Sequence, residues 1–188
     1  MAPALSRAEQ THQRIQEKAL ALITERGFDD VTVEEIAGAA GVSHMTFFRH
    51  FPTKEAVIVS DPYDPVIAEE VARQPRSLPP LERVRRGMWK VSEALSGPLD
   101  SVTRTRIEIG VAHPKLRAAM WENTHQTEQV IVEALVDSGV DHFEARVAAG
   151  ACLGAVMAAL LEWAQHPSGE SLGGRVRRAL EQLGPVSA

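Results

Sequence analysis

The sequence predicts an all-α protein in which a small N-terminal domain of three helices precedes a larger helical domain. Three observations predict this class. Apolar residues recur at helical spacing along most of the 188 residues, and no segment shows the alternation of a half-buried strand. Short turns rich in proline and glycine separate the periodic segments. A hydrophobic content of 44% is enough to form a buried core in a chain of this length.

The first expected helix covers the segment THQRIQEKALALITERG, residues 11–27. Four apolar residues in it fall at positions i, i+4, i+7 and i+8, the spacing of one helix face. They are Ile15, Ala19, Leu22 and Ile23. Gly27 follows and is expected to end the helix, because glycine adopts the conformation of a C-terminal cap at little cost.

Two short helices are expected next. Thr32 begins the second helix, and Glu35, three residues on, completes a capping box. This helix ends at about residue 39 or 40, and Gly41 allows a tight turn. Ser43 caps the third helix, which ends before Pro52 because the residue before a proline disfavours the α conformation.

A pair of short helices joined by a glycine turn and braced by a longer helix is the helix-turn-helix arrangement, whose second helix lies in the major groove of DNA. Helical spacing gives the third helix a buried side and an exposed side. The buried side is predicted to hold Val42, Phe47 and Phe51, and the exposed side His44, Met45 and Phe48. Exposed apolar groups can contact thymine methyl groups, and Thr46 can bond a base or a phosphate.

Other interpretations of this segment stay open. A three-helix packing unit that binds no DNA has the same pattern, because aromatic residues at helical spacing often belong to a core. His50 can also cap or pack against a helix end, since a neutral imidazole both donates and accepts hydrogen bonds. A metal site shared by His44 and His50 is excluded, because residues six apart lie on different sides of a helix.

The stretch TVEEIAGAAGVSHMTFFRHFPTKEA, residues 32–56, resembles the DNA-binding domain of the TetR family of bacterial repressors. That family commonly has the pattern T-x-x-x-I-A-x-x-A-G-V-S-x-x-T-x-Y-x-H-F-x-x-K. The residues that match it here are Thr32, Ile36, Ala37, Ala40, Gly41, Val42, Ser43, Thr46, His50, Phe51 and Lys54. The resemblance implies that Thr32, His50 and Lys54 contact phosphates and that residues 43–46 approach base edges.

The chain departs from the family pattern at two positions. Phe48 replaces a tyrosine whose hydroxyl reaches a phosphate, so that hydrogen bond is absent. His44 stands where a lysine is frequent, which replaces a fixed charge by one that titrates near neutral pH. The proposed DNA-binding set is Thr32, Ser43, His44, Met45, Thr46, Phe48, His50 and Lys54.

We expect residues 1–54 to form the DNA-binding domain and residues 55–188 to form a ligand-binding and dimerisation domain, with nine or ten helices in all. The segment DPYDPVIAEEVARQPRSLPPLERVRRGM, residues 61–88, is similar to the C-terminal domain of TetR members related to the mycofactocin regulator. That resemblance implies an acyl-CoA-like effector. Residues 73–117 hold ten basic and four acidic side chains, a balance that suits an anionic ligand.

Large soft side chains mixed with a few polar groups are typical of ligand pockets, although the same residues at helical spacing often form a core. The candidate effector-binding residues are Met88, Trp89, Trp121, Thr124, His125 and Met157.

The uncharged run at residues 147–161 is shorter than the about 20 residues that a membrane-spanning helix needs, so we expect burial and no membrane association. Gly150 and Gly154, four residues apart, allow another helix to approach closely. A homodimer interface is therefore expected to contain Gly150, Gly154, Ala158 and Trp163.

The predicted function is that of a ligand-responsive transcriptional repressor, which binds a palindromic double-stranded DNA operator as a homodimer and is released by a small-molecule effector. We expect no cofactor, no metal and no catalytic residues. Cys152, the single cysteine, is expected only to pack, and the polar N-terminus indicates a cytoplasmic protein. One alternative is an all-α enzyme, against which the sequence shows no nucleophile, base and orienting residue in a catalytic arrangement. The other is a helical adaptor that does not bind DNA.

Overall fold

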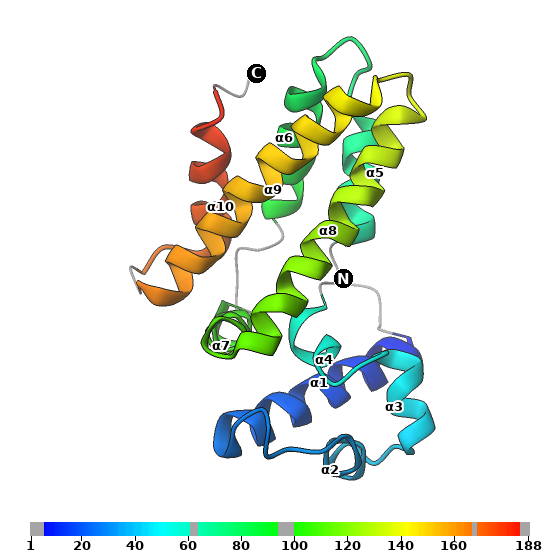
Figure 1. Cartoon of the computed structure of the whole chain (residues 1–188), viewed down its shortest axis with the longest axis vertical. Coiled ribbons are helices and arrows are strands. Elements are labelled where there is room, and N and C mark those ends of the chain that lie inside the picture. Colours follow the sequence, from blue (N-terminus) through cyan, green and yellow to red (C-terminus); the bar gives the residue numbers. More distant parts are fainter. Residues whose placement is uncertain (1–5, 61–63, 94–99, 167–168, 185–188) are drawn as a thin grey trace. The chain divides into compact units, whose positions relative to one another are not determined.

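The computed structural model describes residues 6–60, 64–93, 100–166 and 169–184 (Figure 1). These residues form ten helices and no strand, which confirms the predicted all-α class. The helices are α1 (Arg7–Arg26), α2 (Val33–Ala39), α3 (His44–His50), α4 (Ala56–Val59), α5 (Asp64–Arg73), α6 (Pro80–Ser92), α7 (Asp100–Ala112), α8 (Pro114–Val136), α9 (His142–Gln165) and α10 (Leu172–Glu181).

The chain divides into two compact units. The N-terminal unit contains Met1–Ser60 together with Ile109–Met120, and the C-terminal unit contains Asp61–Glu108 and Trp121–Ala188. The first crossing between them therefore falls after residue 60, six residues beyond the expected boundary. The end of α7 and the start of α8 belong to the N-terminal unit, which the sequence did not predict.

The first helix begins earlier than expected but ends where predicted. A capping box at Ser6 and Glu9 starts α1, because each side chain bonds the backbone N–H of the other. Gly27 caps its C-terminus with φ of 90°, a left-handed value that favours glycine. The buried face includes Leu20, while Leu22 is only partly buried.

The predicted turn signals of the next two helices are confirmed. Thr32 and Glu35 form the capping box of α2, and Ser43 Oγ accepts from the backbone N–H of Thr46 to cap α3. Gly41 has φ of 65° in the turn between them. After Pro52 the helix α4 has only four residues, and Thr53 Oγ1 accepts from the N–H of Ala56 just before it.

One apolar cluster, here called the N-terminal core, holds the N-terminal unit together. Its buried residues are Ile15, Ala19, Leu20, Ile23, Phe28, Val31, Ile36, Ala37, Ala40, Phe47, Phe51, Val57, Ile58 and Leu116. Leu116 comes from α8, far from the others in sequence, and is fully buried. The unit is therefore assembled from two separate stretches of chain.

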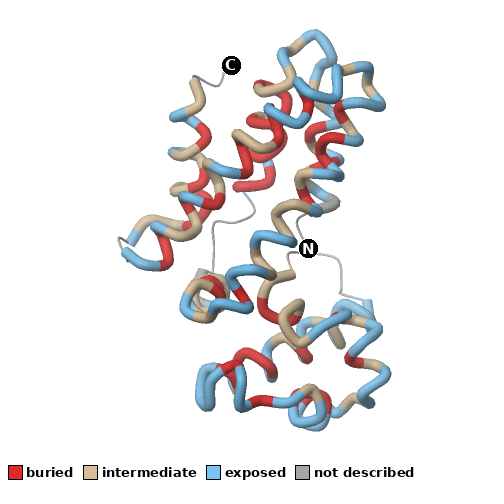
Figure 2. The backbone as a smooth tube through the Cα atoms, in the orientation of Figure 1, coloured by how far each residue is buried: buried red, intermediate tan, exposed pale blue. Residues whose placement is uncertain are grey.

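In the C-terminal unit α6 packs against α5, α9 and α10, and α9 also packs against α10. Buried residues follow the lengths of α6 and α9 (Figure 2). Gly87 allows α5 and α6 to approach closely, because a Cβ added there would lie 2.6 Å from Val71 Cγ2. Nine residues of α9 are buried, but by length and composition alone this helix could also cross a membrane.

Candidate nucleic-acid interface

Helix α3 has one face fixed in the N-terminal core and one face open to solvent. Phe47 and Phe51 are fully buried, as predicted. Met45 is 73% exposed and Phe48 is 39% exposed, so two large apolar side chains project from the opposite face. Single apolar residues at a surface are ordinary, but an adjacent pair on a helix-turn-helix matches the apolar edges that DNA presents in the major groove.

His44 lies beside an acidic group on the same surface. Its Nε2 is 3.2 Å from Glu34 Oε1, and its ring centroid is 4.7 Å from that of Phe48. The imidazole is therefore in contact with a carboxylate from α2 and an aromatic ring from α3. A lysine at this position would carry its charge further from the helix, so the replacement noted in the sequence changes both charge and reach.

The hydroxyl groups of the interface already have intramolecular partners. Ser43 Oγ and Thr46 Oγ1 are 2.9 Å apart, and Thr32 Oγ1 bonds both the backbone N–H and the carboxylate of Glu35. Each hydroxyl oxygen has a second lone pair, so contact with DNA remains compatible with these bonds. The bonds fix the hydroxyl positions before DNA arrives.

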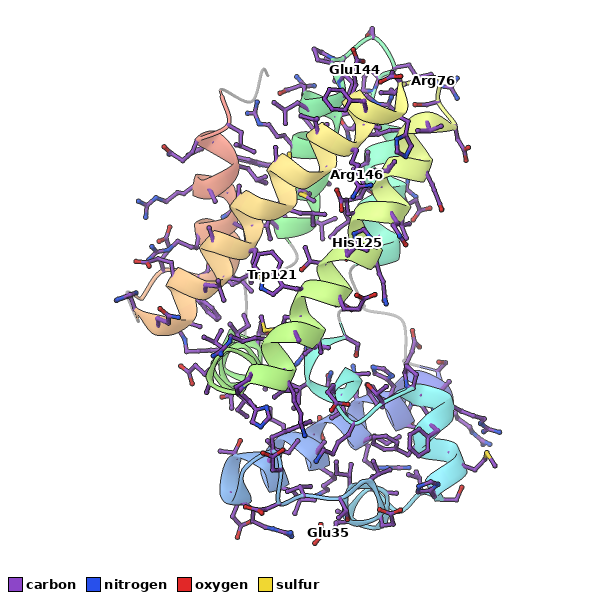
Figure 3. All side chains as sticks on the ribbon, in the orientation of Figure 1. Glu35, Arg76, Trp121, His125, Glu144 and Arg146 are labelled. Carbon is purple, nitrogen blue, oxygen red and sulfur yellow. The ribbon has the colours of Figure 1, made fainter. Side chains whose placement is uncertain are left out.

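Glu35 anchors the start of α2 (Figure 3). Arg26 Nη1 donates a 2.8 Å hydrogen bond to Glu35 Oε1. This bond, with further bonds from Thr32, lowers the pKa of Glu35 to about 2. The carboxylate is thus charged at neutral pH and ties the end of α1 to the first turn of α2.

Lys54 has a structural position that the sequence did not reveal. Its Nζ donates hydrogen bonds of 2.7 and 2.8 Å to the carbonyl oxygens of Phe28 and Val31, and it lies 4.2 Å from the centre of the Phe28 ring. An ammonium group has three N–H donors, so one is left for a phosphate. The expected phosphate contact stays a prediction, and Lys54 also holds the loop between α1 and α2.

His50 is half-buried at the end of α3. Its ring centroid lies 5.9 Å from that of His12, whose own ring lies 4.2 Å from Phe51. Packing and phosphate contact therefore both remain open for His50. Two further residues are candidates on this surface: Arg49, exposed in the last turn of α3, and His12, which α1 brings beside His50. The local sequence indicates Arg49 as a basic residue in the last turn of the helix. It does not indicate His12, because that residue is 38 positions away from His50.

The candidate effector residues fall into two groups in the C-terminal unit. Met88 and Met157 are buried and Trp89 is half-buried, whereas Trp121 is 61% exposed. Thr124 and His125 are half-buried on α8, and Figure 3 labels His125 on this helix. These positions range from core to surface, and binding by the six residues stays a prediction.

His125 belongs to a polar network that links α8 to α9. Its Nδ1 lies 3.0 Å from Glu128 Oε2, and Arg146 Nε on α9 lies 3.7 Å from Glu128 Oε1.

Burial raises the pKa of Cys152, also on α9, to about 12, so this thiol is protonated and packs without reactivity, as expected. Within the described parts of the chain no cluster of three or more His, Cys, Asp or Glu side chains is placed to hold a metal ion.

The expected dimer residues differ in how far they are exposed. Gly154 and Ala158 are exposed, and Gly150 is half-buried. Trp163 is fully buried in its own chain, where Nε1 donates to the carbonyl oxygen of Glu170 and the guanidinium of Arg104 lies 3.8 Å from its ring centre. Trp163 is therefore unavailable to a partner, and we leave it out of the proposed interface.

Comparison with known proteins agrees with this architecture. Residues 15–60 match the family described as bacterial regulatory proteins, tetR family, and residues 78–188 match the MftR C-terminal domain. The second match alone covers more than half of the chain.

Two relatives and one solved structure give the detail. EthR, an HTH-type transcriptional regulator of Mycobacterium tuberculosis, is 33% identical over 69 residues, 37% of this chain and 32% of EthR. MftR of the same species, named as a mycofactocin biosynthesis transcriptional regulator, is 39% identical over 51 residues, 27% of this chain and 26% of MftR. The chain thus aligns with about a third or less of the length of these relatives.

The crystal structure of FadR from Thermus thermophilus, a TetR family transcriptional repressor in complex with lauroyl-CoA, has the same fold. Its TM-score is 0.52 at 24% identity, over 92% of this chain and 92% of FadR. The two family matches, the capped helix-turn-helix and this shared fold agree with one another. The chain belongs to the TetR family of bacterial regulatory proteins, with a C-terminal domain of the MftR type.

Proposed function

We propose that this protein is a transcriptional repressor that binds operator DNA through α3. One observation carries the proposal: α3 is fixed from behind by the fully buried Phe47 and Phe51, while Met45 and Phe48 project into solvent. A rigid helix with an exposed reading face is what base readout in the major groove requires. Thr32, Ser43, Thr46, His50, Lys54 and the newly noted Arg49 are proposed to position this helix through phosphates or base edges.

The repressor is proposed to act as a homodimer on a palindromic operator. The exposed side of α9 is apolar and includes two small residues. Phe143 is 74% exposed, and Val147, Gly154 and Ala158 are exposed on the same helix. Gly154 and Ala158 let a second helix come close, and a two-fold pair of α3 helices then reads two half-sites. Packing of α9 against its copy in the partner is also the proposed reason why this helix is so apolar. We therefore propose that α9 does not cross a membrane and that the protein is cytoplasmic.

The effector is proposed to be an apolar molecule with an anionic head, such as an acyl-CoA. Met88 and Met157 are soft apolar side chains buried within the unit, and Trp89, Trp121, Thr124 and His125 are half-buried or exposed, so a ligand can cover them. FadR, which has the same fold, binds lauroyl-CoA. Binding that favours a DNA-incompetent arrangement would release the operator.

Selection of tight binders from a random DNA library tests the proposal directly. We expect enrichment of an inverted repeat, because a two-fold dimer reads both halves of its site. Affinity for the enriched sequence should fall steeply with salt, as it does for proteins that neutralise phosphates. The alternative of a helical adaptor predicts no enriched sequence. A matched pair of variants, Thr46→Ala on α3 and Thr24→Ala on the exposed side of α1, then separates loss of a DNA contact from a general effect.

A further inference from the structure

Arg83 is a buried cation in the C-terminal unit. It lies in the first turn of α6, and only 1% of its surface is exposed. Its Nη1 donates a 2.7 Å hydrogen bond to Ser138 Oγ, in the turn between α8 and α9. Its Nε and Nη2 are also buried, and neither atom makes a hydrogen bond to any of the described residues. Two donors of a charged group are thus enclosed without a hydrogen-bond partner in the described part of the chain.

The neighbouring arginines on α6 differ from Arg83 in having a carboxylate partner, although Arg85 Nε is likewise buried without a hydrogen bond. Arg85 Nη1 and Arg86 Nε each donate to the carboxylate of Glu82, at 3.0 and 2.8 Å. Arg85 also bonds the carbonyl oxygen of Gly184. The acidic group on this part of the helix is therefore already shared by two cations, and among the described residues the hydrogen bond of Arg83 goes to the neutral hydroxyl of Ser138.

An enclosed guanidinium without a counter-charge is strongly unfavourable. Burial and the positive charge of Arg76 lower the pKa of Arg83, but a guanidinium remains protonated at neutral pH. Arg76 is itself exposed, in the loop between α5 and α6 (Figure 3). Two positive charges therefore act on one region, and an anion there would relieve both their repulsion and the cost of burial.

The identity of the two unpaired donors specifies the kind of anion. Nε and Nη2 lie on one edge of the planar guanidinium, where their N–H bonds point in parallel. That edge matches the two oxygens of a carboxylate or of a phosphate, which accept both bonds at once. A chloride ion offers a single centre and lacks this match.

We propose that Arg83 is the anchor of an oxyanion-binding site, in which a carboxylate or phosphate accepts from Nε and Nη2 and Arg76 adds a second, outer positive charge. The anion is either inorganic phosphate or the anionic head of an organic ligand. It enters when the side chains around Arg83 move aside, because both donors are enclosed. The site is independent of the proposed DNA-binding function and is measured on the protein without DNA.

Thermal unfolding at constant ionic strength tests the site. Inorganic phosphate, hexanoate or lauroyl-CoA is titrated in place of chloride, and a saturable rise in Tm is expected for at least one of them, because a ligand that binds only the folded state stabilises it. Arg83→Met should lose this rise. In chloride alone Arg83→Met should be at least as stable as the parent, since an unpaired buried charge has been replaced by an apolar side chain of similar length. A lower Tm of Arg83→Met in chloride, with no anion response in the parent, would instead show a purely structural arginine.

Control variants keep the test decisive. Arg73→Met removes the same charge from the exposed side of α5 and should keep the full anion response. If Arg83→Met does not fold, Arg83→Lys serves in its place: it keeps the charge without the bidentate edge, and the half-saturating concentration should rise about tenfold. A response to phosphate or hexanoate identifies a free oxyanion, and a response to lauroyl-CoA alone identifies the head of an organic ligand. An equal response in the parent and the Arg83 variants means an adventitious ion only and overturns the proposal, as does no response in the parent.

Discussion

His113 Nε2 lies 3.0 Å from Asp29 Oδ2, and its ring packs 5.0 Å from that of Phe28. The pair joins the loop after α1 to the turn between α7 and α8, inside the N-terminal unit. The hydrogen bond from His113, helped by the charges of His113, Lys115 and Lys54, lowers the pKa of Asp29 below its ordinary value.

This pair makes stability depend on pH in a defined direction. A carboxyl group whose pKa is lower in the folded state contributes stability above its unfolded pKa, about 3.9, and loses that contribution as the pH falls through the folded value. Asp29→Asn should therefore unfold at lower urea than the parent at pH 7, and the gap should close at the acidic end. Urea midpoints measured from pH 7 downward check this, and a gap that stays constant with pH would contradict it.

Lys54→Met should reduce the free energy of unfolding by about 1–3 kcal/mol, because the carbonyl oxygens of Phe28 and Val31 lose a charged donor. Lys18→Met, on the exposed side of α1, is the matched control and should have little effect. The same variants separate the two roles of Lys54. If its third N–H reaches a phosphate, the plot of log operator affinity against log salt concentration should become shallower by about 1 in Lys54→Met and stay unchanged in Lys18→Met.

Met45→Ala and Phe48→Ala should weaken operator binding with little change in stability, because both side chains project into solvent. Phe47→Ala should instead lower the free energy of unfolding by about 3–5 kcal/mol, since it opens a cavity behind the same helix. Fluorescence anisotropy with the selected operator and urea unfolding give the two readouts. Operator affinity unchanged in both exposed variants would remove α3 as the reading helix.

Gly154→Leu tests the dimer with little ambiguity. A Cβ added at Gly154 meets no side chain or other helix of the described residues within 4 Å, so the space around this position is open in the protomer. Bulk there should disrupt only a contact with a second copy, at a cost of roughly 1–3 kcal/mol. Light scattering should show dissociation at concentrations where the parent is dimeric, and a normal dimer would place the interface elsewhere. Gly150→Leu is less clean, because its Cβ would lie 3.5 Å from Glu128 Oε1.

Trp121→Ala should leave stability nearly unchanged, since the side chain is largely exposed. If the effector covers this part of α8, the concentration of acyl-CoA that releases operator should rise at least several-fold, because an indole buries a large apolar area. Val102→Ala, an exposed apolar residue on α7, is the control. Operator release at unchanged acyl-CoA concentration would exclude Trp121 from the effector site.

Local features of the fold were readable in the sequence. Thr32, Glu35 and Ser43 act through bonds to residues three positions away, so their spacing alone predicts the caps. The buried side of α3 was readable for the same reason, because Phe47 and Phe51 lie one turn apart.

Features that depend on distant partners were not readable. Lys54 bonds carbonyl oxygens 26 and 23 positions earlier, and nothing in the local pattern distinguishes that contact from a phosphate contact. Trp163 belongs to a helix with apolar residues on several sides, so periodicity does not say which side faces its own chain. The unpaired donors of Arg83 were hidden for a related reason: the sequence shows three arginines near Glu82, but not which of them share it.

The burial of Leu116 has a consequence for chimeric regulators. A repressor with altered operator preference is most simply made by exchanging N-terminal segments between relatives, with the junction after residue 60. Such a hybrid keeps the host's residues at 109–120, so a foreign core must accept Leu116, which is buried in the N-terminal core, and His113, which contacts Phe28 and Asp29. Transplanting residues 109–120 along with the N-terminal segment would carry the matching surface, and modular exchange in this protein is therefore a two-segment operation.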